Sequence, residues 1–254
     1  MIKYIKEEGE EMDELRSILS ESSNIVFFGG AGTSTESLIP DFRSESGIYK
    51  TKNGYAYPPE TMLSHTFFIN HTEDFFEFYK SKMIYKDAQP NPAHLALAKL
   101  ERLGKLKAVI TQNIDGLHQR AGSVNVLELH GSVHRNYCMD CGENYDLAYI
   151  VSSPGIVPVC RKCSGIVRPD VVLYEEQLDE EILDRAVSCI QKAEILIVGG
   201  TSLVVYPAAN LIHYYSGDKL ILINKAVTPY DGRANIVIHD SIGKVLKAAT
   251  EFSH

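Results

Sequence analysis

The sequence predicts an α/β fold with a doubly wound parallel sheet, a helical insertion and a small metal-binding module. Short apolar segments rich in β-branched residues recur along the chain, and helical patterns separate them. Several of these segments are apolar at every position, which is typical of strands covered on both faces. Strand and helix alternation of this kind indicates parallel strands in a Rossmann-like arrangement. The third observation is a set of four cysteines in two close pairs.

The alternating elements can be placed along the chain from these patterns. The expected strands are 24–30, 107–113, 126–131, 168–174, 194–200, 219–225 and 235–240. The expected helices are 10–21, 92–103, 179–192, 207–215 and 241–251.

Two segments interrupt the alternation. Residues 46–91 are rich in aromatic side chains and are expected to form a helical insertion, while residues 134–167 contain the cysteine pairs. The Rossmann-like domain is therefore expected to comprise 1–45, 92–133 and 168–254. A small lobe formed by both insertions over the carboxyl edge of the sheet would create a cleft, where ligands of such folds bind.

Composition and charge narrow the classes of partner. The chain has 254 residues and a formal net charge of −8, which disfavours nucleic acid because domains that bind it usually carry a basic face. No apolar run approaches the roughly 20 residues that a helix needs to span a bilayer. The acidic, amphipathic start of the chain does not resemble a signal peptide. We therefore expect a cytoplasmic protein with no nucleic-acid or membrane partner.

The cysteines predict a metal site. Cys138, Cys141, Cys160 and Cys163 form the pattern C-x2-C-x18-C-x2-C, which in a reducing compartment favours metal over disulfides. Four thiolates satisfy tetrahedral zinc and leave no open position, so one structural zinc ion is expected. An iron–sulfur cluster is the alternative occupant. Cys189 lies in a helical pattern and is expected to be a small buried residue.

A glycine-rich turn follows the first expected strand. The stretch GGAGTS follows an apolar run, so its backbone amides could face a pyrophosphate. The dinucleotide fingerprint would require glycine where Thr35 stands, and a turn without a ligand is the alternative. The next residues, Asp41, Phe42 and Arg43, favour a site, because an aromatic ring and a guanidinium can cover an aromatic leaving group and neutralise phosphate.

Polar residues also follow the second and third strands. Gln112, Asn113 and Asp115 lie at one strand end, where ligands of parallel sheets bind. An Asx turn or helix cap is the alternative for Asp115. His130 lies at the next strand end and is placed to act as a base, with an imidazole that is neutral near physiological pH. A structural histidine is the alternative, a role that also suits His134.

Two further strand ends carry polar groups. A second glycine turn, VGGTSLVVYPA, presents Thr201 and Ser202, and the strand 219–225 ends in Asn224. Dinucleotide folds usually place an acidic ribose-binding residue at that last position. Each group alone could be a cap or a turn, but four such strand ends together favour one binding site.

Over residues 24–240, the chain resembles the sirtuins, which are NAD-dependent protein lysine deacylases. The resemblance rests on a set of motifs in the family order: GAGTSTESLIPDFRS, TQNIDGLH, HGSVH, the cysteine pairs, GTSLVVYPA and INKA. The resemblance implies an acyl-lysine peptide bound between a Rossmann domain and a small lobe. It further implies that the acyl oxygen attacks the nicotinamide ribose, that nicotinamide leaves, and that His130 deprotonates a ribose hydroxyl. NAD is thus consumed, and the products are free lysine, nicotinamide and O-acyl-ADP-ribose.

The resemblance also implies residue roles. His130 and Asn113 are expected to be catalytic, and the four cysteines to hold zinc. The expected NAD-binding residues are Ala31, Thr35, Phe42, Arg43, Gln112, Ile114, Asp115, Thr201, Ser202, Asn224, Asp240 and Ile242. The backbone of Val171, Val172 and Leu173 is expected to pair with the peptide as an added strand.

The chain departs from the family pattern at two places. Leu38 replaces the usual glycine before IPDFR, and Tyr174-Glu175-Glu176 stands where Phe-Gly-Glu is usual. Glu175 would add a charge near the peptide, which could favour basic substrates. Desuccinylating members carry a Tyr and an Arg in the acyl pocket; no such pair occurs in 70–90, so acetyl is the expected acyl group.

Four other functions are possible for these motifs. Mono-ADP-ribosyl transfer, or removal of another neutral acyl group, would use the same NAD site. A non-catalytic sensor of NAD or ADP-ribose is disfavoured by His130, Asn113 and Asp115, since binding alone needs no base. A redox dehydrogenase is disfavoured by the missing third glycine and by Asn224. The expected oligomeric state is a monomer.

Overall fold

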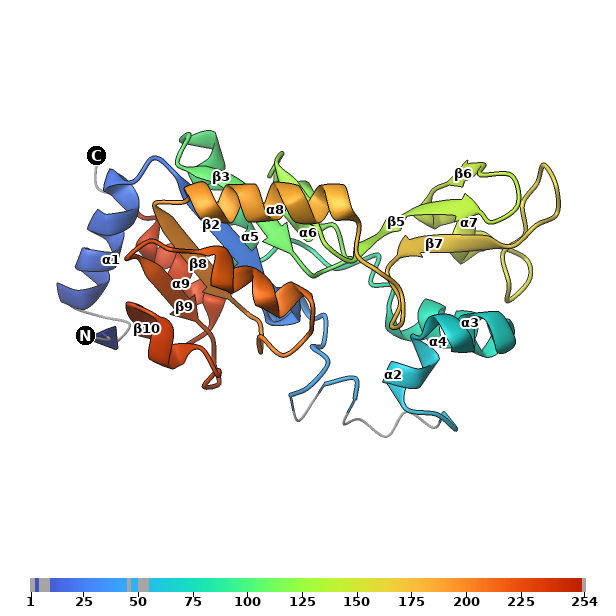
Figure 1. Ribbon diagram of the computed structural model, residues 1–254. Coiled ribbons are helices and arrows are strands. Elements are labelled where there is room, and N and C mark those ends of the chain that lie inside the picture. Colours follow the sequence, from blue (N-terminus) through green and yellow to red (C-terminus); the bar gives the residue numbers. More distant parts are fainter. Residues whose placement is uncertain (1–2, 5–9, 45–46, 50–54, 253–254) are drawn as a thin grey trace.

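The protein has two lobes, which lie at opposite ends of the molecule (Figure 1). The structure is a computed structural model, and it describes residues 3–4, 10–44, 47–49 and 55–252. The larger lobe contains a parallel sheet, and the smaller contains an antiparallel sheet with short helices. Within these described ranges, no helix combines the length and the apolar character needed to cross a bilayer.

The large sheet confirms the predicted doubly wound architecture. Its seven strands run in the order β1-β10-β9-β8-β2-β3-β4, and every neighbouring pair is parallel. Its strands are β1 (Lys3–Tyr4), β2 (Ile25–Gly29), β3 (Leu106–Thr111), β4 (Val126–Glu128), β8 (Ile195–Gly199), β9 (Leu220–Ile223) and β10 (Ile236–Ile238).

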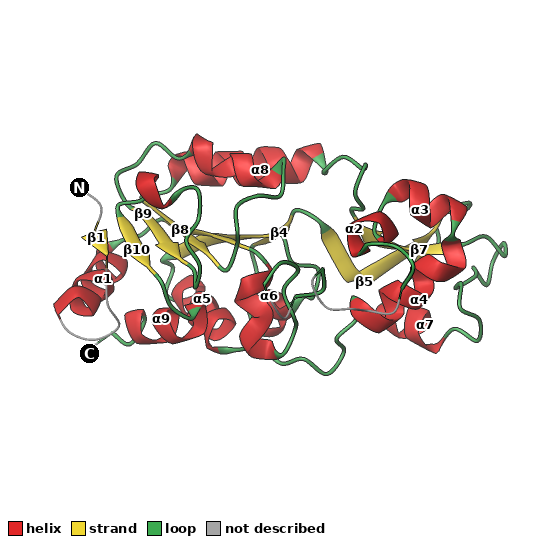
Figure 2. Ribbon diagram, turned by 90° about the horizontal axis from the view of Figure 1, so that it is seen from below, coloured by secondary structure: helices red, strands yellow, loops and turns green. Residues whose placement is uncertain are grey.

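Helices cover both faces of this sheet (Figure 2). One face carries α1 (Glu10–Glu21), α5 (Pro92–Arg102) and α9 (Ile242–Ala249). The other carries α8 (Glu180–Lys192) and the 3-10 helix η2 (Ala208–Tyr214). The segment 207–215, expected to be helical, thus forms the tighter 3-10 type.

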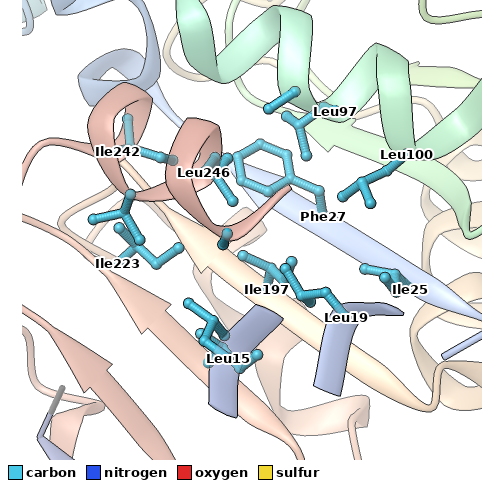
Figure 3. Close-up of a cluster of buried hydrophobic side chains, with 14 of the residues drawn as sticks. Leu15, Leu19, Ile25, Phe27, Leu97, Leu100, Ile197, Ile223, Ile242 and Leu246 are labelled. Carbon is cyan, nitrogen blue, oxygen red and sulfur yellow. The ribbon is translucent and has the colours of Figure 1, made fainter. Parts of the chain in front are cut away.

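The continuous apolar runs follow from this double cover. In β2, Ile25 and Phe27 join the core under α1, α5 and α9, whereas Val26 and Phe28 join the core under α8. Figure 3 shows Phe27 among Leu97 and Leu246 in the first of these cores. Because alternate residues face opposite sides of a sheet, both sets must be apolar.

The small lobe has its own sheet, in the order β6-β5-β7. Its elements are β5 (Gly131–Cys138), β6 (Asn144–Tyr145), β7 (Val167–Val171), α2 (Pro59–Met62), α3 (His65–Asn70), α4 (Thr72–Lys82) and α7 (Leu147–Ser152). One core joins aromatic residues of 59–82 to the sheet. Of the expected helical insertion 46–91, residues 46 and 50–54 lie outside the described part.

One strand assignment was wrong. The segment 168–174 was placed among the alternating strands of the parallel sheet, but β7 pairs antiparallel with β5 in the small lobe. Likewise, the expected strand 126–131 ends at Glu128, and β5 starts separately at Gly131. Gly131 has φ +74°, and a Cβ there would lie 2.0 Å from the backbone oxygen of Asp170. Close pairing of β5 with β7 at this point therefore requires glycine.

Candidate active site

A cavity of about 710 Å³ is lined by both lobes. Its lining includes strand-end residues of the large sheet, the segment after β7, and residues of α4. All the site residues expected from the sequence, apart from the cysteines, line this cavity: Ala31, Thr35, Phe42, Arg43, Gln112, Asn113, Ile114, Asp115, His130, Val171, Val172, Leu173, Thr201, Ser202, Asn224, Asp240 and Ile242.

The two glycine turns interlock on one wall of the cavity. The Gly32 N–H donates to the Gly200 carbonyl at 2.8 Å, because β2 and β8 are neighbours in the sheet. Gly200 has φ +59°, and a Cβ there would lie 2.3 Å from the nitrogen of Thr33. Side chains are therefore excluded where the turns meet. Backbone amides can come close to a phosphate at such a surface.

Ser34, Asn113 and Asp115 form a hydrogen-bonded cluster beside the turns. The Ser34 hydroxyl donates to Asp115 Oδ2 at 2.7 Å and accepts from Asn113 Nδ2 at 3.0 Å. Asp115 Oδ1 accepts from the Leu117 N–H at 2.9 Å, so the Asx-type turn also exists. Burial raises the pKa of Asp115. The cluster fixes both carboxylate oxygens at the cavity wall.

His130 is arranged as a proton acceptor. Its Nδ1 lies 3.0 Å from the carbonyl oxygen of Gln112, and since a carbonyl only accepts, Nδ1 carries the proton. Nε2 is then unprotonated in the neutral ring. Burial lowers the pKa of His130 from its ordinary 6.5, so the ring is neutral at physiological pH. By contrast, His134 Nε2 lies 3.1 Å from the Asp115 carbonyl, as in the alternative structural role.

The segment 41–44 forms a tight turn that is held by the side chain of Asp41. Asp41 Oδ1 accepts from the N–H groups of Arg43 and Ser44 at 3.0 and 2.8 Å. The Phe42 ring packs 5.3 Å from the Tyr49 ring, centroid to centroid. The Tyr49 hydroxyl is 2.6 Å from the Tyr174 hydroxyl, which follows β7. This contact joins two segments that both line the cavity.

At the ends of β8 and β9, polar side chains form hydrogen bonds within the protein. Gln112 Nε2 donates to Thr201 Oγ1 at 3.2 Å, joining the ends of β3 and β8. Thr201 is buried, whereas Ser202 is exposed. Asn224 Nδ2 donates to the Ala226 carbonyl at 2.8 Å, and its amide oxygen can accept from other donors.

The segment 171–173 uses several backbone groups within the chain. The Val172 N–H donates to the His130 carbonyl at 3.0 Å. The Leu173 N–H donates to Glu176 Oε2 at 2.9 Å, and its carbonyl accepts from the Glu176 N–H. An added peptide strand therefore has only the other groups of this segment to pair with.

Both departures from the family pattern have left-handed backbones. Leu38 has φ 65° and is 89% exposed, and Glu175 has φ 76°. The Glu175 carboxylate accepts from the Thr66 N–H at 2.9 Å, in the first turn of α3. Glu175 also lines the cavity, so its charge near the peptide stays a prediction, and the contact with Thr66 places this charge at the start of a helix, a favourable position for an anion.

Sequence reasoning missed part of the cavity wall: Glu36, Tyr49, Tyr79, Lys82, Met83 and Tyr85. The Tyr79 hydroxyl is buried and has no hydrogen-bond partner among the described residues. The spacing of Tyr79, Lys82 and Met83 in a helical pattern shows that they share a face. Nothing in the sequence shows which lobe that face meets.

The four cysteines fit a zinc ion. Their sulfur atoms lie within 4.8 Å of one another, with 3.4 Å between Cys138 and Cys163 and 3.6 Å between Cys141 and Cys160. Zinc–sulfur bonds of about 2.3 Å in a tetrahedron place sulfur atoms about 3.8 Å apart. The turns that carry the two cysteine pairs have the same hydrogen bond. The Gly142 N–H donates to the Cys138 carbonyl, and the Ser164 N–H donates to the Cys160 carbonyl. Cys189 lies elsewhere, in α8, and is half-buried rather than buried.

Known proteins share this sequence and fold. The Sir2 family profile matches residues 30–207. A Clostridium acetobutylicum protein named NAD-dependent protein deacetylase is 68% identical over 238 residues, which cover 94% of this chain and 97% of that protein. A Clostridium perfringens protein of the same name is 60% identical, with coverages of 93% and 97%.

Solved structures agree. A Sir2 protein with a deacetylated p53 peptide and 3′-O-acetyl ADP ribose has a TM-score of 0.86 and 40% identity, over 94% of this chain and 97% of that one. A Sir2 homologue in complex with NAD has a TM-score of 0.82 and 38% identity, over 94% and 92%. The chain belongs to the Sir2 family.

Proposed function

We propose that this protein is an NAD-dependent protein lysine deacetylase, which transfers the acetyl group of acetyl-lysine to ADP-ribose and releases nicotinamide. The family and the names of the similar proteins support the activity. The observation that carries it for this chain is that His130, the two glycine turns and the Asn113–Asp115 cluster line one cavity. This arrangement supports the proposal that His130 acts as a base beside a surface suited to a dinucleotide.

The reaction needs two bond exchanges at the ribose. The acetyl oxygen of the lysine amide attacks the ribose carbon that bears nicotinamide, and nicotinamide leaves with the electrons of the broken bond. His130 Nε2 then takes the proton of a ribose hydroxyl, whose oxygen attacks the alkylamidate carbon. The lysine amine leaves with a proton, and water adds to the same carbon. The bond from that carbon to the oxygen on the former nicotinamide-bearing carbon then breaks, which leaves a hydroxyl there and the acetyl ester on the second oxygen, that is, O-acetyl-ADP-ribose. The neutral His130 ring supplies the proton acceptor that the second step requires.

The other wall residues bind and orient the dinucleotide. Asp115 and Ile114 hold the carboxamide of nicotinamide, and Asn113 and Gln112 contact the ribose and its water. Ala31 and Thr35 line the phosphate turn, Arg43 neutralises phosphate, and Phe42 shields the reacting ribose. On the adenosine side lie Thr201, Ser202, Asn224, Asp240 and Ile242.

The peptide and the metal have separate places in this proposal. The acyl-lysine peptide pairs with 171–173, so that main-chain bonds give affinity with little sequence selectivity. The zinc ion held by the four cysteines is structural, because a site with four protein ligands has no open position for a substrate.

The test is product analysis with acetyl-lysine peptide and NAD. Mass spectrometry is expected to find O-acetyl-ADP-ribose and free lysine peptide in equal amounts, with matching nicotinamide release. Attachment of ADP-ribose to protein, without O-acetyl-ADP-ribose, would favour mono-ADP-ribosyl transfer. A panel of neutral acyl peptides then tests the expected preference for acetyl.

We further propose that the protein acts in the cytoplasm as a monomer, without binding nucleic acid. The net charge of −8 and four free cysteines arranged for metal support this proposal. Light scattering after gel filtration tests the monomer, with a mass near 28.3 kDa expected.

A further inference from the structure

Glu36 joins the first glycine turn to the start of α9. It belongs to the 3-10 helix η1 (Ala31–Ser37), which follows Gly30. Its Oε1 accepts from the Ser241 hydroxyl at 2.6 Å and from the Gly243 N–H at 2.8 Å. These partners are 205 and 207 residues away in the sequence. The carboxylate thus takes the capping position that the Ser241 side chain leaves unused.

Close packing also fixes this junction between the first glycine turn and the start of α9. A Cβ on the buried Gly243 would lie 2.4 Å from Glu36 Oε2, so the carboxylate occupies the space that any side chain there would need. On the other side, a Cβ on Gly199 would lie 2.2 Å from Ile242 Cδ1. The start of α9 is therefore held to the first glycine turn by Glu36 and to the end of β8 by Ile242.

The junction forms part of the cavity wall. Glu36 lines the cavity together with Asp240 and Ile242, which flank its partner Ser241, and with Thr35, its own neighbour. Asp240 and Ile242 are the residues assigned above to the adenosine end of NAD. Their position relative to the phosphate turn is set by the contacts of Glu36.

We propose that Glu36 is a positioning residue for NAD, which keeps the adenosine end of the site in register with the phosphate turn. It acts through Ser241 and Gly243 and takes no part in the chemical steps. This inference rests on the proposed placement of NAD in the cavity. Loss of the carboxylate frees the start of α9 and weakens the binding of any ligand that spans both ends.

The experiment compares Glu36→Ala with Glu36→Gln, which keeps an oxygen that accepts from both donors. The Michaelis constant for NAD and the dissociation constant of ADP-ribose, measured by calorimetry, are expected to rise about five- to tenfold in Glu36→Ala, since two hydrogen bonds are lost. Glu36→Gln is expected to stay within about twofold. The turnover number and the Michaelis constant for the peptide should change little in both variants.

Glu101 offers a matched control. Its carboxylate also accepts from two backbone amides, those of Val124 and Asn125 at 2.9 and 2.8 Å, and it does not line the cavity. Glu101→Ala is expected to leave ADP-ribose affinity unchanged. Equal weakening in the control, or unchanged ADP-ribose affinity in Glu36→Ala, would overturn the inference.

A milder variant covers the case in which Glu36→Ala does not fold. Ser241→Ala removes one of the two donors and is expected to weaken ADP-ribose binding about two- to threefold; unchanged affinity there would contradict the inference. Because ADP-ribose binding needs no catalysis, this result is separate from the proposed function. Absence of O-acetyl-ADP-ribose in the wild type would refute the proposed function alone.

Discussion

The two walls of the cavity are built in different ways. On the large-lobe wall, Asn113, Thr201 and Asn224 each follow a buried parallel strand, so the sheet itself brings these three residues to one edge. On the small-lobe wall, position depends on contacts between remote segments. The large-lobe wall should therefore keep its structure when a substitution disrupts the small lobe.

Contacts between 63–66 and 174–176 hold the small-lobe wall. Tyr174 donates its N–H to the Leu63 carbonyl and accepts from the His65 N–H, both at 3.0 Å. Glu176 Oε1 lies 2.8 Å from His65 Nδ1, and this contact ties the start of α3 to the segment after β7. Arg168 donates to both oxygens of Glu176, at 2.9 and 3.0 Å. Among the described residues, only an isolated parallel bridge between Ser64 and Tyr174, and no named pair of strands, joins these two segments.

Removal of a zinc ligand should have the largest effect on activity, and it tests whether the two walls of the cavity are independent. Cys160→Ser is expected to lose zinc and, with it, measurable deacetylation, because structural zinc supplies folding energy to its module. ADP-ribose binding, which uses the large-lobe wall, should persist. Metal analysis, activity and calorimetry check the three expectations. Cys189→Ala, which leaves the cluster intact, is the control, and equal loss of ADP-ribose binding and activity in Cys160→Ser would break the distinction.

Removal of the proposed base should lower the turnover number without preventing ligand binding. His130→Ala is expected to reduce the turnover number for deacetylation by about 10²- to 10⁴-fold, the range for loss of a general base. Affinity for ADP-ribose should change far less. Steady-state kinetics and calorimetry give both values. Deacetylation that survives at the wild-type rate would refute the role of His130.

Acidic pH should reduce activity through the same ring. Burial lowers the pKa of His130 below 6.5, and only the neutral ring can accept the proton. Activity should therefore stay level as pH falls to 6.5 and decline at lower pH, about tenfold per unit once the ring is protonated. The pH profile of kcat/KM measures this. An acidic limb centred above 6.5 would contradict the assignment.

Leu38 and Glu175, which both have a left-handed backbone, should respond differently to substitution by glycine. Leu38→Gly is expected to stabilise the protein by about 0.5–1 kcal/mol, because relief of backbone strain exceeds the added freedom of the unfolded chain. Glu175→Gly relieves the same strain but loses the carboxylate bound to Thr66. Its gain should be smaller than that of Leu38→Gly. Urea unfolding measures both, and equal gains would show that the Glu175 contact contributes nothing.

The large lobe could be predicted because its signals are local. A strand buried on both faces is apolar throughout, and polar residues directly after it mark the sheet edge, as at Asn113 and His130. The same rule failed for β7. Val167 and Val171 of β7 join the small-lobe core together with Leu173, which follows the strand, so the apolar positions of this segment resemble those of a strand in the parallel sheet.

The rest of the site depends on contacts that have no local signal. Glu36 meets Ser241 across 205 residues, and His65 meets Glu176 across 111. Neither pair forms a motif that short-range spacing can indicate. Glu175 shows the same limit, since only the fold reveals that its carboxylate faces the start of α3.

The most direct test of the account is a structure with NAD and an acetyl-lysine peptide bound together. We expect both in the one cavity, with a ribose hydroxyl about 2.6–3.2 Å from His130 Nε2 and the peptide along 171–173. A dinucleotide and a peptide bound in separate places, with His130 far from the ribose, would contradict it.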